Sequence, residues 1–90
     1  MKNFLTYSGI KLPLKLVNPL AEEEVGHRNT YYRGYYDSNE KLVRCEKVVY
    51  GEVEQKHDYE YYDNDIIKQA TISVHGEVQT IKYDERGFPL

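Results

Sequence analysis

The sequence contains a single cysteine, no tryptophan, three prolines and no long apolar run. One cysteine cannot form a disulfide within the chain, so we expect a cytoplasmic protein. No stretch approaches the ~20 apolar residues of a membrane-spanning helix, and no leader-like segment is apparent, so no membrane contact is expected. Lys and Arg total 12 against 15 for Asp and Glu, a net charge of −3. The chain therefore lacks the excess of positive charge that favours binding to nucleic acid.

The composition is that of a small folded domain with many tyrosines. Of the 90 residues, 40% are hydrophobic and 30% charged, which is typical of one soluble domain over residues 1–90. The chain has ten tyrosines but only two phenylalanines. Most of the tyrosines lie in two clusters, residues 31–36 and 59–62. Tyrosine suits the half-buried, pleated surface of a strand, so the clusters predict β-structure first and a binding face second.

Residues 10–16 show the clearest alternation of apolar and polar side chains, which predicts a strand with one buried face. Pro13 cannot donate to a strand ladder, so this strand is expected at a sheet edge or at a bulge. The Asn-Pro pair at 18–19, followed by three glutamates, is typical of a helix start, and Gly26 is typical of a helix end. These signals predict a short helix near residues 19–25, with an acidic, solvated turn as the alternative.

The rest of the chain has the pattern of short strands separated by turn residues. The strands are predicted at residues 3–8, 29–37, 41–50, 53–62, 66–74 and 78–83. Because the connections are short, neighbouring strands are expected to pair antiparallel. We therefore predict an α+β, mostly β fold: an antiparallel meander sheet of about five or six strands with one short helix near residues 19–25. One short helix covers a sheet face poorly, so the sheet is expected to curl or to form a homodimer.

The sequence contains a loose internal repeat that follows these strands. Tyr-Asp pairs at 36–37, 62–63 and 83–84 each end a predicted strand, and Gly-Glu-Val at 51–53 is repeated at 76–78. The segment from Gly76 to Gly87, with Tyr83 and Asp84 before the last glycine, resembles the tyrosine–aspartate (YD) repeat of bacterial Rhs-type proteins. Earlier units within residues 31–87 resemble it more weakly because they lack that glycine. In that family the repeats build β-sheet shells, which implies a structural or enclosing role.

The chain is also similar as a whole to a group of short uncharacterised bacterial proteins. Residues 5–16 and 47–54 carry this second resemblance most clearly. It implies no particular activity.

The candidate binding residues lie on the two tyrosine-rich strands. They are Tyr31, Arg33, Tyr35, Tyr59 and Tyr61. Residues two apart on a strand share a face, so the first three form one row and the last two another. Tyr and Arg are enriched in interface hot spots, and the leading hypothesis is therefore a non-enzymatic interaction module with a protein partner. Cross-strand packing is the alternative role of these rings.

Two alternative functions stay open. Glu52, Glu54, Asp58 and Glu60 share one face of a predicted strand. Such a row is either a solvated surface or the contact face of an acidic inhibitor, of phage or mobile-element type, that binds a nucleic-acid-processing machine. The second alternative is a small enzyme with a site built on His57 and a tyrosine. The competing structural role of His57 is that of a packed, hydrogen-bonded histidine.

Motifs for catalysis or metal binding are lacking. The three histidines do not have the spacing that would place two of them together on a helix, and Cys45 has no CxxC partner, so we expect no metal and no cofactor. Cys45 shares its strand face with valines and is predicted to be a small core residue. Without a nucleophile elbow, a phosphate loop or a metalloprotease motif, no catalytic residues are assigned.

Overall fold

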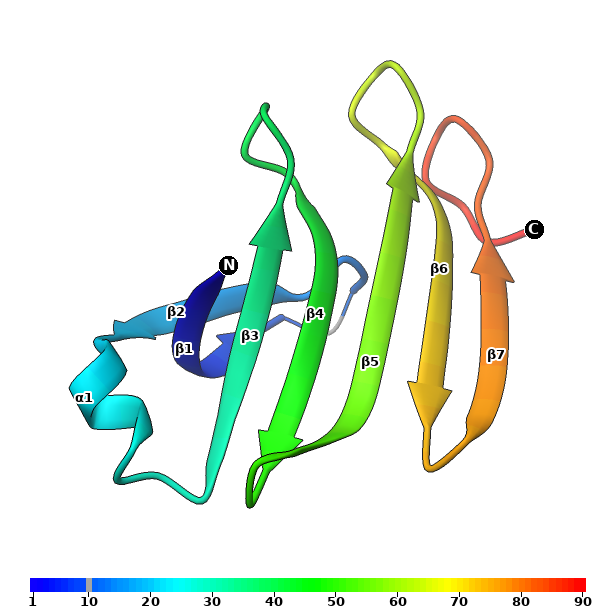
Figure 1. Cartoon of the computed structure of the whole chain (residues 1–90). Helices are drawn as coiled ribbons and strands as arrows, with labels where there is room; N and C mark the ends of the chain where they lie inside the picture. Colours follow the sequence, from blue (N-terminus) through cyan, green and yellow to red (C-terminus); the bar gives the residue numbers. More distant parts are fainter. Residues whose placement is uncertain (10) are drawn as a thin grey trace.

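The computed structural model describes residues 1–9 and 11–90. Figure 1 shows the order of the elements, which are β1 (Lys2–Ser8), β2 (Lys15–Leu20), α1 (Glu22–Val25), β3 (Thr30–Tyr36), β4 (Leu42–Val49), β5 (Glu52–Tyr61), β6 (Ile67–Val74) and β7 (Glu77–Lys82). The predicted mostly β, antiparallel architecture is confirmed. The predicted five or six strands are corrected to seven among the described residues.

The strands form one antiparallel sheet in the order β2-β1-β3-β4-β5-β6-β7. From β3 to β7 each strand pairs with its neighbour in the sequence, which is the meander that the short turns predict. The first strand departs from this order because β1 lies between β2 and β3. It pairs with β3 only over Lys2–Phe4, whereas its pairing with β2 extends to Ser8. The remainder of the β1–β2 hairpin is thus free to leave the plane of the sheet.

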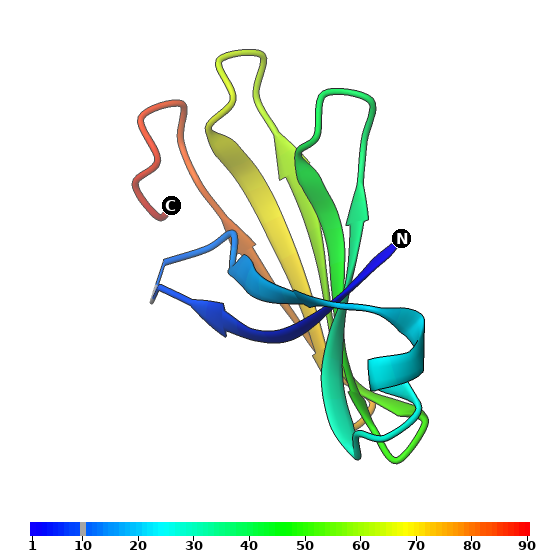
Figure 2. The same cartoon turned by 90° about the vertical axis from the view of Figure 1, so that its left-hand side faces the viewer.

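This hairpin crosses one face of the meander, as Figures 1 and 2 show. We call that face the covered face; it carries Gly34, Cys45, His57 and Ile72, which are aligned across β3 to β6. The opposite, open face carries the neighbouring row Arg33, Glu46, Lys56 and Ser73.

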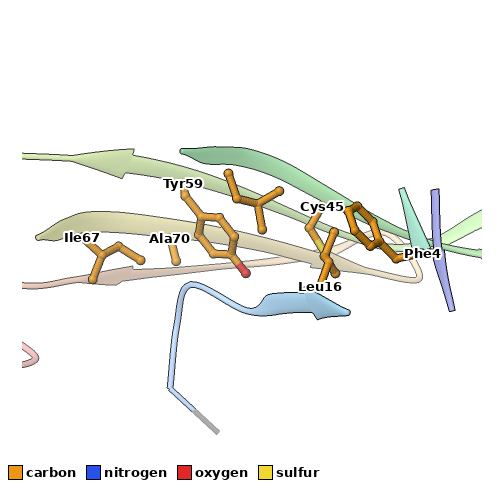
Figure 3. Packing of buried hydrophobic residues seen from close by; sticks show 7 residues of the cluster. Phe4, Leu16, Cys45, Tyr59, Ile67 and Ala70 are labelled. Atoms are coloured by element: carbon orange, nitrogen blue, oxygen red, sulfur yellow. The ribbon is translucent and has the colours of Figure 1, made fainter. Parts of the chain in front are cut away.

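The main core lies between the hairpin and the covered face. Figure 3 shows its buried residues, which are Phe4, Leu16, Leu42, Cys45, Tyr59, Ile67 and Ala70. Four further tyrosines, Tyr32, Tyr36, Tyr61 and Tyr83, pack against this cluster. With Tyr59, half of the ten tyrosines therefore serve the core. The prediction that Cys45 is a core residue is confirmed, since its side chain is buried.

The strand predicted at residues 10–16 and the helix predicted at 19–25 need correction. Residue 10 lies outside the described residues, residues 11–13 form a bend, and the strand runs instead over Lys15–Leu20. Pro13, for which a sheet edge or a bulge was expected, lies in this bend and not in a strand. Pro19 can lie in β2 because this strand is at the sheet edge. The ladder with β1 continues to Leu20, so only residues Glu22–Val25 remain for the helix, which begins after Ala21.

The turns repeat along the meander. In each loop after β3, β5 and β7, one N–H donates to the carbonyl four residues on; the donors are Asp37, Tyr62 and Asp84. The residue three positions after the donor has positive φ each time, at Glu40, Asp65 and Gly87. At the other end of the sheet, Tyr50–Gly51 and His75–Gly76 are paired positive-φ residues, as two-residue hairpin turns require. The internal repeat in the sequence thus corresponds to repeated turn geometry. In the first and last loops the donor is the Asp of the Tyr-Asp pair, whereas in the middle loop it is the residue before Asp63.

Candidate functional site

The structure divides the five predicted binding residues between the two faces. Tyr31, Arg33 and Tyr35 lie half-buried on the open face. Tyr59 lies on the covered face and is only 4% exposed. Tyr61 packs against the core, and its hydroxyl donates to the carbonyl of Leu42 at 2.6 Å. The two predicted rows therefore differ in burial: the row on β3 lies at the surface, and the pair on β5 packs in or against the core.

The cross-strand register causes this separation. Gly34 is opposite Cys45, and Cys45 is opposite His57. Even-numbered residues of β3 consequently share the covered face with odd-numbered residues of β5, so Tyr35 and Tyr59 point to opposite sides. Alternation within each strand is readable from the sequence, whereas the offset between strands is not.

The open face joins β3 to β4 through a carboxylate. Arg33 Nη1 lies 3.7 Å from Glu46 Oε1, and the hydroxyl of Tyr35 donates to the same oxygen at 2.9 Å. The guanidinium of Arg33 also lies 6.0 Å from the centre of the Tyr31 ring, within reach of a cation–π contact. Glu46 is 9% exposed, so its charge is held by these partners rather than by water. The contacts fix the positions of the three predicted binding residues.

A second ion-pair group extends the open face to β5. The Nε–H of Arg44 donates to Asp58 at 2.7 Å, and Lys56 Nζ lies 3.8 Å from the other oxygen of that carboxylate. Glu54 is paired at 3.4 Å with Lys47, which belongs to the covered face. Two members of the predicted acidic row, Asp58 and Glu54, thus have basic partners.

On the covered face, a chain of hydrogen bonds connects β5 to the hairpin. His57 Nδ1 lies 2.7 Å from the hydroxyl oxygen of Tyr59, and its Nε2 lies 2.8 Å from Gln55 Nε2. The Tyr59 oxygen accepts the N–H of Leu14 at 3.3 Å. Figure 3 shows this hydroxyl pointing toward the segment that leads into β2. His57 and Tyr59, the pair considered for an enzyme, are therefore in contact. The side chain of His57 is buried, with only 5% exposed.

A small cavity of about 160 Å³ adjoins this network. Its lining residues are Tyr7, Leu14, Tyr32, Cys45, Lys47, Gln55 and His57. Burial lowers the pKa of His57, so the imidazole is neutral near pH 7. Burial also raises the pKa of the Cys45 thiol to about 12, so no thiolate is present. Both ring nitrogens of His57 lie within hydrogen-bond distance of protein groups. The arrangement is suited to holding the hairpin in place.

Among residues 1–9 and 11–90, no three His, Cys, Asp or Glu side chains come together as a metal site would require. None of the helical structure described is long and apolar enough to cross a membrane. Glu46 on the open face is the most important site residue that the sequence prediction lacked. Alternation on β4 could have placed it on one face with Arg44. It could not have placed Glu46 opposite Arg33, or Arg44 opposite Tyr35 and Asp58.

These features define a small antiparallel β-sheet domain with one face closed by its own hairpin and the other bearing ordered tyrosines and ion pairs. The chain matches the model of a family of unknown function, DUF6156, over residues 1–90 and belongs to that family. No curated protein and no solved structure matches it. The resemblance to a group of uncharacterised proteins is confirmed to this extent.

The buried imidazole makes stability depend on pH. Unfolding exposes His57 and returns its pKa to about 6.5, above the folded value. Below about pH 6.5 the unfolded state therefore binds more protons, and the free energy of unfolding falls with acidification. We expect urea unfolding between pH 8 and pH 5 to show a shallower loss of stability in His57→Gln than in the wild type. Carboxylates contribute equally to both proteins, so parallel profiles would contradict this prediction.

Proposed function

We propose that this protein is a non-enzymatic binding module that docks a protein partner on the open face of β3 to β5. The contact residues are Tyr31, Arg33, Tyr35 and Arg44. The supporting observation is that the two faces of the sheet differ in what covers them. The β1–β2 hairpin lies on one face, and the other bears a Tyr-Arg-Tyr row with ion pairs beside it. Tyr and Arg at the centre of a patch are the residue types that carry most binding energy in protein interfaces.

The geometry of the row supports ready binding. Tyr35 and Arg33 are already held by Glu46, so little side-chain freedom is lost when a partner docks. Arg44 uses its Nε–H for Asp58, and its terminal N–H groups are suited to a carboxylate of the partner. The proposed partner surface therefore combines apolar side chains that cover the tyrosine rings with at least one acidic residue.

The proposal predicts a loss of affinity confined to the open face. The immobilised wild-type protein would be used to capture and identify a partner from cells that produce it, and the dissociation constant would then be measured with purified components. Tyr31→Ala and Arg44→Gln are each expected to weaken binding about tenfold, as hot-spot truncations do. Tyr50→Ala is the matched control, because this tyrosine is 77% exposed and lies in the β4–β5 turn. Equal affinities of all four proteins would refute the open face as the docking surface.

We further propose that the protein acts in the bacterial cytoplasm. The free thiol of Cys45 remains reduced in that compartment. The resemblance to YD repeats implies a structural or enclosing role, which agrees with a function that needs no catalysis.

A further inference from the structure

A groove of about 670 Å³ lies between the end of the β1–β2 hairpin and the C-terminal segment. The hairpin contributes Lys11 and Leu12 to its walls, and the C-terminal part of the chain contributes Ile81, Tyr83, Arg86 and Phe88. Figure 2 shows the hairpin end and the C-terminal segment on the same side of the sheet, away from the open face. The volume lies within the range of about 300–1,000 Å³ that is usual for small-molecule sites.

The walls of the groove are apolar and anchored to the core. Leu12 and Tyr83 pack against the core cluster, and Ile81 is opposite the fully buried Ala70. Phe88, in contrast, is 63% exposed. An apolar ligand could therefore bury surface on Phe88 that the chain itself leaves in water.

The C-terminal wall is held in position by hydrogen bonds. The carboxylate of Asp84 accepts the N–H groups of Arg86 and Phe88 at 2.9 and 3.0 Å. The N–H of Leu90 donates to the carbonyl of Lys82 at 2.8 Å, beside the bridge between Tyr83 and Pro89. A ligand would meet a formed wall and would not have to order it.

The charge of the groove has one sign. Lys11 lies on the hairpin wall and Arg86 on the opposite wall, and none of the lining residues is acidic. Neither cation belongs to any of the ion pairs found in the described part of the chain. Two acids adjoin the lining residues in sequence, Asp84 after Tyr83 and Glu85 before Arg86. The carboxylate oxygen of Asp84 is engaged by the loop amides, and Glu85 is not among the lining residues. The groove is therefore complementary to an anion with an apolar body.

We propose that this groove binds a small amphipathic carboxylate. The hydrocarbon or aromatic part lies against Leu12, Ile81 and Phe88, and the carboxylate lies between Lys11 and Arg86. This site is on the other side of the sheet from the docking surface proposed above and is independent of it. Selectivity follows from the lining, since an ammonium group would meet two cations and a neutral head group would gain no charge pairing.

The test uses octanoate as the probe, with octanol and octylammonium as partners of equal chain length. Titration of the isotope-labelled protein, followed by amide NMR shifts, is expected to show octanoate binding with shifts at Ile81, Tyr83 and Phe88. Octanol should bind more weakly, and octylammonium should bind least.

Two double variants distinguish binding in the groove from general electrostatic attraction of the carboxylate to the protein. Lys11→Gln with Arg86→Gln is expected to weaken octanoate binding roughly fivefold, the effect of two exposed charge pairs. Lys15→Gln with Arg28→Gln removes the same charge outside the groove and should leave the affinity unchanged. The proposal is overturned if no shifts appear at millimolar octanoate, if they map to the His57 cavity instead, if octanol binds as well, or if both double variants behave alike.

Discussion

Replacing Tyr59 by alanine is expected to lower the free energy of unfolding by about 3–5 kcal/mol. The ring is nearly completely buried in the core between the hairpin and the covered face. Its hydroxyl also contacts the N–H of Leu14 and the imidazole of His57. The substitution thus leaves a cavity and removes a partner from two polar groups, each of which costs free energy. Urea unfolding followed by circular dichroism measures the loss.

Two further variants separate the contributions to this loss. Tyr59→Phe keeps the ring and removes only the hydroxyl, so a smaller destabilisation of about 1–3 kcal/mol is expected. Tyr50→Ala removes an exposed ring and should change stability by no more than about 0.5 kcal/mol. Similar losses in Tyr50→Ala and Tyr59→Ala would contradict the placement of Tyr59 beneath the hairpin.

Gly34→Ala is the second substitution with a large expected effect, a destabilisation of about 1–3 kcal/mol. A Cβ atom at this position would lie 2.7 Å from Leu16 Cδ1 and 2.9 Å from Tyr36 Cε1. Gly34 is paired on both sides, with Lys2 of β1 and Cys45 of β4, so its backbone cannot easily withdraw. The added methyl group therefore pushes the hairpin away from the sheet. Thermal unfolding and hydrogen exchange at the Leu14 amide would report the loosening.

Gly26→Ala is the matched control for this methyl group. Gly26 has φ −62, which alanine adopts readily, and the nearest atom to an added Cβ is 3.8 Å away. Unchanged stability, or a gain of up to about 1 kcal/mol from the less flexible unfolded chain, is expected. If Gly34→Ala were as stable as Gly26→Ala, the close approach of hairpin and sheet would be disproved.

The meander was predictable from the sequence because its signals are local. Turn residues and tyrosine-rich segments identified all five strands from β3 to β7 to within about two residues, the usual uncertainty of strand ends. The first 25 residues were harder, since β2 contains Asn18 and Pro19, a pair that favours a helix start. Pairing with β1 overrides that preference, and such pairing is a tertiary contact that a local pattern does not contain.

The candidate site was predictable only in part, for a related reason. Tyr31, Arg33 and Tyr35 share a face as expected from alternation. The relation of this row to Tyr59 depends on the register between strands, which shifts between Tyr35 and Tyr36 and again along β5. Because a shift by one residue exchanges the two faces, no argument from single strands could decide which tyrosines are buried.

The repeated turns have a consequence for how such a sheet can change in length. The loops after β3, β5 and β7 share one hydrogen-bond pattern, and the turns before β5 and β7 share a pair of positive-φ residues. Each strand pair is thus a modular unit with the same entry and exit geometry. Another unit with the same geometry, grafted after β7, would extend the sheet at the edge opposite to β2.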